Sequence, residues 1–209
     1  MMGDYVISCE DVDETSLVGS IRKVVDWITN NVLANGKALV VVGEAGSGKT
    51  TALFLAMRRL KRLGVSAAYI NAYNELGLKH VKFIECGDFN KAHVLLIDDI
   101  DVALAMPRMA HGLIDKVLGF TGTVVMTLTI PLMVSNDLET LEPLIRLLHS
   151  APRMGIEYHY EDLKAFAKKF GIDEIEPTVR TPGMILRNFR KWDNTAKVNA
   201  VLNDGDAVL

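Results

Sequence analysis

The tightest constraint on the fold of this chain is the segment Gly43–Thr50, which reads Gly-Glu-Ala-Gly-Ser-Gly-Lys-Thr. It matches the phosphate-binding pattern G-x-x-x-x-G-K-[ST] at every fixed position. The short apolar run Ala38–Val42 directly precedes it and is typical of a strand buried on both faces. The run Thr50–Leu63 follows with the pattern of a helix that stops at Gly64. The sequence therefore predicts a strand, a glycine-rich loop and a helix in direct succession.

The loop is expected to hold the phosphates and the metal of a nucleotide. Its glycines let successive backbone N–H groups turn toward a phosphate, and the positive N-terminal end of the following helix faces the same charge. Lys49 is predicted to bridge the β- and γ-phosphates during catalysis, and Thr50 to offer its hydroxyl to Mg²⁺. The alternative is a glycine-rich turn that binds nothing, which the strand and the helix on either side disfavour. The predicted nucleotide-binding residues of the loop are Gly43, Glu44, Ala45, Gly46, Ser47, Gly48, Lys49, Thr50 and Thr51.

A second apolar run, His93–Ile97, ends in two carboxylates, Asp98 and Asp99. It looks like a Walker B strand, with Asp98 holding the Mg²⁺ shell and Asp99 orienting and deprotonating the attacking water. Many P-loop ATPases have glutamate at the second position. Because aspartate is one methylene shorter, a helix N-cap or a salt-bridge partner is the alternative role for Asp99. Asp101 is expected to be an exposed cap.

The predicted nucleotide is ATP. Guanine-specific proteins carry an N-K-x-D element after the acidic strand. The nearest match here, Asn90-Lys91-Ala92-His93, lacks the aspartate and precedes that strand. Adenine is therefore favoured, and ATP and Mg²⁺ are the expected cofactors.

Strand-like and helical segments alternate along the first three quarters of the chain, which predicts an α/β fold with a mostly parallel sheet and helices on both faces. From Glu161 onward only helical pattern is present. We therefore expect a P-loop α/β nucleotide-binding core over residues 1–160 and a small helical lid over residues 161–209. The remaining predicted elements are helices over Leu17–Leu33, Glu161–Phe170 and Gly183–Trp192, strands over Ala67–Ile70, Thr123–Leu128 and Ile156–Tyr160, and a helical segment over Val102–Phe120 interrupted at Pro107 and Gly112.

Composition limits the partners and the compartment. The net charge of −3, from 23 Lys+Arg against 26 Asp+Glu, gives no overall attraction to nucleic acid or to an acidic membrane. The charge-free run Val117–Asn136 is rich in threonine and turn formers, so a buried strand followed by a loop is favoured over a membrane span. Two cysteines and no signal-peptide pattern predict free thiols and a cytoplasmic location. Glutamine is absent, which fits the depletion of thermolabile amides reported for hyperthermophile proteins.

The order of these pieces resembles the AAA+ ATPases, in particular the branch of replication initiators and helicase loaders, whose acidic strand often reads Leu-Ile-Asp-Asp, as Leu96–Asp99 does here. The resemblance implies a three-layer sandwich with a five-stranded sheet of order 5-1-4-3-2 and a small C-terminal helical lid. It also implies that Leu17-Val18-Gly19 wraps the adenine, which makes Val18 a nucleotide-binding residue.

The resemblance further implies two sensors of the γ-phosphate. Val124–Thr129 looks like the sensor 1 strand, with Thr129 nearest the sensor position and Thr127 as the alternative, although the family usually has asparagine there. Thr181–Arg187 resembles the sensor 2 helix, with Arg187 as its arginine. The Ser-Arg pair of an arginine finger is not recognisable, and Arg146 and Arg153 are nearest to it in the sequence.

The leading functional hypothesis is a Mg²⁺-dependent ATPase that couples its nucleotide state to remodelling or loading of a partner, in DNA replication by analogy with the family. A homo-oligomer, a protein partner or DNA would fit, and no membrane is expected. A nucleotide-switched binding module with little hydrolysis and a P-loop phosphotransferase are the alternatives. The candidate catalytic residues are Lys49, Asp99, Thr129 and Arg187, and the candidate metal ligands are Thr50 and Asp98.

Overall fold

A computed structural model describes residues 19–34, 36–78 and 86–187 of the 209-residue chain. Contacts divide the chain into two compact units. The first comprises Met1–Glu44 and Gly48–Glu157, and the second comprises Ala45–Ser47 and Tyr158–Leu209. The tip of the glycine-rich loop is thus grouped with the C-terminal part of the chain. We describe each unit by itself.

The first unit is built on a parallel sheet of five strands in the order β2-β3-β4-β1-β5. Read from the other edge, this is the predicted order 5-1-4-3-2, so the predicted sheet topology is confirmed. The strands are β1 (Ala38–Glu44), β2 (Ala67–Asn71), β3 (Val94–Asp98), β4 (Thr123–Ile130) and β5 (Arg153–Gly155).

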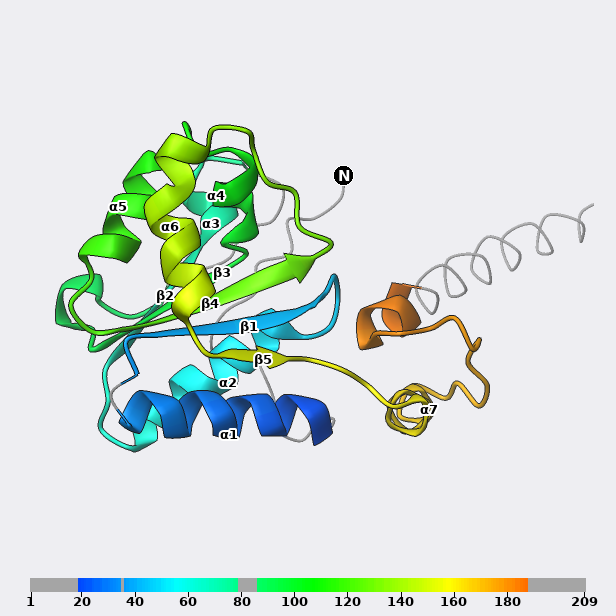
Figure 1. Cartoon of the computed structure of the whole chain (residues 1–209). Coiled ribbons are helices and arrows are strands. Elements are labelled where there is room, and N and C mark those ends of the chain that lie inside the picture. The colour runs from blue at the N-terminus through cyan, green and yellow to red at the C-terminus, as the bar shows by residue number, and fades with distance from the viewer. Residues whose placement is uncertain (1–18, 35, 79–85, 188–209) are drawn as a thin grey trace, which may run out of the picture. The chain divides into compact units, whose positions relative to one another are not determined.

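Helices cover both faces of this sheet, as expected for a parallel sheet whose strands are connected by crossovers. Figure 1 shows α1 and α2 on one face and α4, α5 and α6 on the other. The helices of the first unit are α1 (Gly19–Leu33), α2 (Lys49–Arg62), α3 (Ala72–Glu75), η2 (Phe89–Lys91), α4 (Asp101–Ala105), α5 (His111–Gly119) and α6 (Leu138–Ser150).

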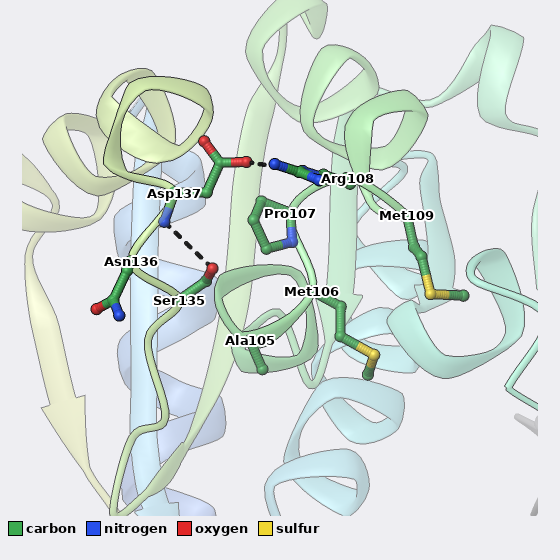
Figure 2. Close-up of a pocket in the computed structure, with 8 residues that line it drawn as sticks. All are labelled: Ala105, Met106, Pro107, Arg108, Met109, Ser135, Asn136 and Asp137. Atoms are coloured by element: carbon green, nitrogen blue, oxygen red, sulfur yellow. Dashed lines mark hydrogen bonds and ion pairs between the residues drawn. The ribbon is translucent and has the colours of Figure 1, made fainter.

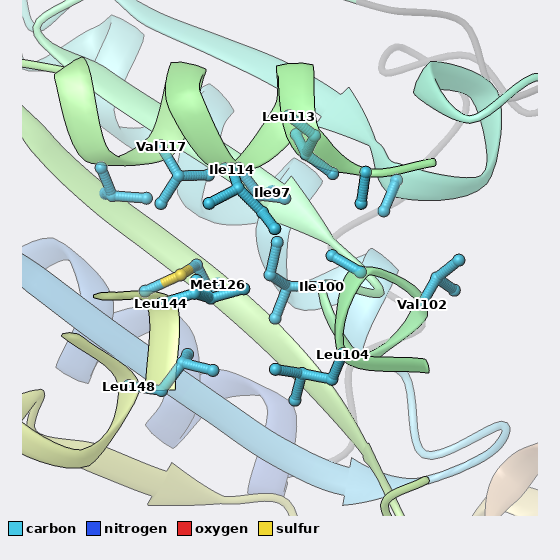
Figure 3. Close-up of a cluster of buried hydrophobic side chains, with 14 of the residues drawn as sticks. Ile97, Ile100, Val102, Leu104, Leu113, Ile114, Val117, Met126, Leu144 and Leu148 are labelled. Carbon is cyan, nitrogen blue, oxygen red and sulfur yellow. The ribbon is translucent and has the colours of Figure 1, made fainter. Parts of the chain in front are cut away.

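The hydrophobic core between the sheet and helices α4, α5 and α6 fixes the position of the acidic strand. Strand β3 is buried along its whole length, from Val94 to Asp98. Ile97 and Met126, on neighbouring strands, belong to the same buried cluster as Ile114 of α5 and Leu144 of α6 (Figure 3). Burying an aliphatic side chain of this size contributes about 1.5–3 kcal/mol. The carboxylates at the end of β3 are therefore positioned by a strand that is packed in the hydrophobic core.

The predicted fifth strand over Ile156–Tyr160 is wrong in position. The observed strand β5 ends at Gly155, and its three residues pair with Val40–Val42 of β1. Ile156 makes one more backbone hydrogen bond, from its N–H to the Val42 carbonyl at 2.8 Å. It is also buried, whereas the next residue, Glu157, is exposed, so the chain leaves the sheet at this point.

Two details of the helices also differ from expectation. Pro107 lies in the turn between α4 and α5 and separates them, as predicted, but Gly112 lies inside α5 and interrupts nothing. Helix α6 was not predicted, although it contributes the buried residues Leu141, Leu144 and Leu148. The charge-free run Val117–Asn136 forms the end of α5, strand β4 and a loop. None of the helices in the described ranges is long and apolar enough to cross a membrane.

The second unit contains α7 (Tyr160–Lys168) and a helical turn over residues 182–187. The predicted helix over Glu161–Phe170 corresponds to α7. The predicted helix over Gly183–Trp192 is helical in its described part, and its remainder lies outside the described residues. Leu163, Phe166 and Ile185 are buried, and the rings of Phe166 and Phe170 lie 5.1 Å apart.

The expectation of free thiols is wrong at Cys86, which is disulfide-bonded in this structure. Cys86 lies just before Gly87 in a segment that bridges to Tyr69 of β2. The other cysteine of the chain, Cys9, lies outside the described residues.

Candidate functional site

The glycine-rich loop joins β1 to α2 with two residues in the left-handed region, Gly46 at φ 77° and Gly48 at φ 91°. Residues other than glycine rarely adopt this backbone conformation. Lys49, the first residue of α2, is buried, and its Nζ donates to the carbonyls of Gly43 and Glu44 at 3.1 Å each. Burial lowers the pKa of Lys49, and the carboxylates of Asp99, Asp98 and Asp101 oppose that shift.

The loop has unused hydrogen-bonding groups that fit a phosphate. Ser47 is 1% exposed, and its Oγ has no hydrogen-bond partner in the part of the chain that the structure describes. The backbone N–H groups of Gly46, Ser47 and Gly48 likewise donate to no other described residue. Buried polar groups are nearly always paired in native proteins. A ring of N–H groups around such a loop is a concave anion site, so these residues fit the phosphates of a nucleotide.

Asp98 is fully buried at the end of β3, and three hydroxyl groups donate to its carboxylate. Thr50 and Tyr69 donate to Oδ2 at 2.5 Å and 3.0 Å, and Thr127 donates to Oδ1 at 2.6 Å. These hydroxyls come from α2, β2 and β4. A buried charge is tolerated when it is hydrogen-bonded in this way. Asp98 thus joins the acidic strand directly to the phosphate loop through Thr50.

Asp99 follows with a left-handed backbone, at φ 57°, which directs its side chain differently from that of Asp98. Its N–H donates to Thr127 Oγ1 at 2.8 Å, and its Oδ2 accepts from Asn71 Nδ2 at 3.3 Å. Burial and the nearby charges of Asp98 and Asp101 raise the pKa of Asp99 to about 7, against the opposing effects of Lys49 and Asn71. A carboxyl group with such a pKa suits proton transfer at neutral pH. Its side chain does not cap α4, whose N-cap residue is Ile100.

Asp101 is not the exposed cap that the sequence suggested. It is half-buried at the start of α4, and its Oδ1 accepts a hydrogen bond from the backbone N–H of Thr129 at 3.0 Å. Burial raises the pKa of Asp101, while its hydrogen bonds and Lys49 lower it. The carboxylate therefore serves to hold the C-terminal end of β4.

The donor set fits Mg²⁺. The hydroxyl of Thr50 and the carboxylate of Asp98 place two oxygen atoms next to each other. Mg²⁺ in nucleotide sites takes one or two protein oxygens and fills the rest of its shell with water and phosphate. Within the described ranges, no group of three or more His, Cys, Asp or Glu side chains is arranged to hold a metal alone. The site thus suits a metal that arrives with a nucleotide.

The predicted sensor residues lie in different surroundings. Thr127, rather than Thr129, has its hydroxyl against Asp98 and Asp99. Arg187 is an exposed residue of the second unit and forms no ion pair with another described residue. Thr51 is a half-buried residue of α2, and Val18 lies outside the described residues.

The two arginines considered for an arginine finger have other contacts. Arg146 is exposed and pairs with Glu142 one turn earlier in α6, at 2.6 Å. Arg153 donates from Nη2 to the Leu148 carbonyl at 3.1 Å. Neither is placed by these contacts at the acidic strand end.

Sequence reasoning missed Tyr69, in the middle of β2, and Asn71, at the C-terminal end of the same strand. Asn71 is opposite Asp98 in the register of β2 and β3. Because the C-terminal ends of parallel strands meet at one edge, polar side chains there are expected near one another. The polar pair in Ala67–Asn71, unusual in a buried strand, was therefore the available signal.

A pocket of about 600 Å³ lies elsewhere in the first unit, between the end of α4 and the start of α6 (Figure 2). Arg108 and Asp137 form an ion pair there, and the Asp137 N–H donates to Ser135 Oγ. None of the predicted site residues lines it. The pocket is lined by Ala105, Met106, Pro107, Arg108, Met109, Ser135, Asn136 and Asp137.

No protein-family model matches the sequence, and no curated protein matches it. Solved structures do match. The crystal structure of a DNA replication initiation factor superposes with a TM-score of 0.61 at 16% identity over 90% of this chain. AMPPCP-bound DnaA from Aquifex aeolicus gives 0.57 at 14% identity over 87%. The replication initiator DnaA bound to AMPPCP and single-stranded DNA gives 0.55 at 13% identity over 87%.

This chain spans 65% of the length of each of these three chains. At these identities the likeness concerns the fold alone, and it agrees with the family suggested by the sequence motifs. The protein has the fold of these DnaA structures.

Proposed function

We propose that this protein binds Mg-ATP and hydrolyses it, and that it uses its nucleotide state to remodel or load a partner. The observation that carries the proposal is the hydrogen bond between Thr50 Oγ1 and Asp98 Oδ2 at 2.5 Å. It brings the hydroxyl of the phosphate loop and the carboxylate of the acidic strand together as oxygen ligands for one Mg²⁺. The AMPPCP in two of the similar DnaA structures supports a nucleotide at this site.

In the proposed reaction the loop binds and orients the phosphates. The N–H groups of Gly46, Ser47 and Gly48 hold phosphate oxygens, and Lys49 leaves the carbonyls of Gly43 and Glu44 to reach the γ-phosphate. Thr50 and Asp98 would hold Mg²⁺, which would supply positive charge to neutralise the charge that develops on the phosphates. Asp99 takes a proton from the attacking water.

The state of Asp99 is controlled by its neighbours in this proposal. The Asn71 amide holds its Oδ2, and Thr127 holds its backbone N–H. For Asp99 to act as a base it must be ionised, and its pKa of about 7 means that it is only partly ionised at neutral pH. The positive charge of Lys49 favours the ionised form of Asp99, because it lowers the pKa of this carboxyl group. Thr127 is a better placed candidate than Thr129 for sensing the phosphate end of the site.

The larger organisation is part of the proposal. Residues 1–160 would form the nucleotide-binding core and residues 161–209 the helical lid, with Arg187 reaching the γ-phosphate. We also propose a cytoplasmic location. The disulfide at Cys86 is compatible with this location, because intracellular proteins of hyperthermophiles are rich in disulfides. The partner is a second copy of this chain, another replication protein or DNA, supported by the similar DnaA structure that holds single-stranded DNA.

The test is ATP hydrolysis by the wild type, Asp99→Ala and Lys49→Ala over a range of protein concentrations, with and without single-stranded DNA. Asp115→Ala on the exposed side of α5 is a matched control. Turnover that needs Asp99 and Lys49, is unchanged in Asp115→Ala and rises cooperatively with concentration would support an oligomeric ATPase. Turnover that survives Asp99→Ala would contradict the assigned role of Asp99.

A second candidate function is a nucleotide-switched binding module that holds Mg-ATP and scarcely hydrolyses it. Two observations favour it: Asp99 is shorter than the usual glutamate and is already hydrogen-bonded to Asn71, and neither Arg146 nor Arg153 is placed as an arginine finger. The same experiment separates the candidates. Tight binding of Mg-ATP without Asp99-dependent turnover under any condition identifies the binding module.

A further inference from the structure

Three successive carbonyl groups at the tip of the phosphate loop accept hydrogen bonds within the second unit. Thr181 Oγ1 donates to the Ala45 carbonyl at 3.4 Å, and the Gly183 N–H donates to the Gly46 carbonyl at 3.0 Å. The Tyr158 hydroxyl donates to the Ser47 carbonyl at 2.7 Å. All the groups involved belong to the unit that comprises Ala45–Ser47 and Tyr158–Leu209.

Holding these carbonyls also sets the direction of the phosphate-binding N–H groups. A trans peptide is planar, so the N–H of the next residue points opposite to each carbonyl. The Ser47 carbonyl shares its peptide plane with the Gly48 N–H, and the Gly46 carbonyl shares its plane with the Ser47 N–H. Among the described residues these N–H groups have no acceptor. Restraining the carbonyl side therefore leaves the N–H side aimed at a ligand.

Of the three donors, only the Tyr158 hydroxyl can be removed without another change. Thr181 Oγ1 also accepts the Met184 N–H at 3.3 Å, so its loss would disturb the helical turn that follows. Gly183 donates through its backbone, and a Cβ there would lie 2.7 Å from Gly46 Cα. The Tyr158 ring is half-buried, and its hydroxyl is a protonated donor because burial raises its pKa.

We propose that Tyr158 is a positioning residue of the phosphate loop: its hydroxyl holds the Ser47 carbonyl so that the Gly48 N–H faces a nucleotide phosphate. This inference rests on the proposed nucleotide binding. It assigns to Tyr158 no contact with the nucleotide, only the orientation of one peptide group that makes such a contact.

The matched test compares Tyr158→Phe with Tyr160→Phe. Both keep the ring and remove a hydroxyl in the same unit, but the Tyr160 hydroxyl donates to the Ile175 carbonyl, away from the loop. The dissociation constant for ADP is measured by calorimetry in the presence of Mg²⁺. Losing one hydrogen bond that orients a binding group should raise it about two- to tenfold in Tyr158→Phe and leave it unchanged in Tyr160→Phe.

A second readout separates positioning from a loss of folding. In protein labelled with ¹⁵N-glycine, ADP should shift the Gly48 amide resonance of the wild type and of Tyr160→Phe, and should shift it less in Tyr158→Phe at saturating ADP. The melting temperatures of the two nucleotide-free variants should agree. A merely structural role for Tyr158 would leave the Gly48 shift of the saturated complex intact and overturn the proposal.

The outcomes distinguish this inference from the proposed function. If the wild type binds ADP and Tyr158→Phe binds it equally well, only the positioning role of Tyr158 is overturned. If the wild type does not bind ADP at all, the proposed nucleotide binding fails, and the inference fails with it.

Discussion

Replacing Asp99 with asparagine should stabilise the nucleotide-free protein at neutral and alkaline pH. In the native state Asp99 stands beside Asp98 and Asp101, and burial together with these charges raises its pKa from the usual 3.8 to about 7. Asparagine has nearly the same shape, carries no charge and tolerates the left-handed backbone at this position. The substitution Asp99→Asn therefore removes the charge and leaves the backbone geometry in place.

The size of the effect follows from the pKa difference. The difference between a pKa of 3.8 and one of about 7 corresponds to about 4 kcal/mol of destabilisation of the ionised carboxylate, at about 1.36 kcal/mol per pKa unit. The Asp99 side chain is only partly buried, so water screens part of this energy. We therefore expect Asp99→Asn to raise the free energy of unfolding by about 2 kcal/mol at pH 8.

The gain should depend on pH with a definite sign. Below about pH 4 the carboxyl is protonated in both the folded and the unfolded state, so the substitution has little effect there. Between about pH 4 and pH 7 the folded state retains a proton that the unfolded state releases. The free energy of unfolding of the wild type therefore falls as the pH rises through this window, and that fall should be smaller in the variant.

The assay is urea unfolding of both proteins at pH 4, 6 and 8 with a metal chelator and no nucleotide. A stability difference that grows from near zero at pH 4 to about 2 kcal/mol at pH 8 supports the reasoning. A variant that is no more stable than the wild type at pH 8, or a gain that is the same at every pH, would refute it.

Other predictions concern the groups around the same site. Thr127→Val should lower the free energy of unfolding by about 3 kcal/mol in urea titrations, because Asp98 Oδ1 loses the hydroxyl that donates to it and the Asp99 N–H loses its acceptor; Thr127→Ser should restore most of it. Asn71→Ala should move the acidic limb of the pH–rate profile for ATP hydrolysis to higher pH, since the Asn71 hydrogen bond lowers the pKa of Asp99; an unshifted profile would exclude that coupling. Gly183→Ala should weaken ADP binding in calorimetry, because its methyl group would lie 2.7 Å from Gly46 Cα and 3.0 Å from the Gly46 carbonyl oxygen; wild-type affinity would count against the close backbone contact.

The parts of the fold that sequence could predict are those where one local signal determines the structure. The apolar runs that became β1, β3 and β4 are rich in Val, Ile and Leu and are bounded by glycine or charge, so both their type and their place were predictable. The fifth strand was misplaced because Ile156–Tyr160 has the alternating pattern of a strand, whereas pairing with β1 depends on where the edge of the sheet ends.

The same distinction applies to the candidate site: local motifs were predictable from the sequence, whereas residues brought together by strand pairing were not. The phosphate loop, Asp98 and Asp99 are contiguous motifs and could be found in the sequence. The hydroxyl of Tyr69 and the amide of Asn71 reach these carboxylates only because β2 pairs with β3 in one register. Thr127 and Thr129 lie two residues apart in β4 and therefore share one face of the sheet, so the alternation of side chains along the strand does not choose between them. Only the observed hydrogen bonds separate the two threonines.

The central claim, that the glycine-rich loop binds a nucleotide, is tested most directly by calorimetric titration with a non-hydrolysable ATP analogue and Mg²⁺. The wild type should bind the analogue, and Lys49→Ala should bind it at least about tenfold more weakly, because a buried cation that contacts the phosphates is lost. Lys91→Ala, which removes an exposed lysine, is the control and should bind like the wild type. Absence of binding by the wild type, or equal affinity in Lys49→Ala, would contradict the account.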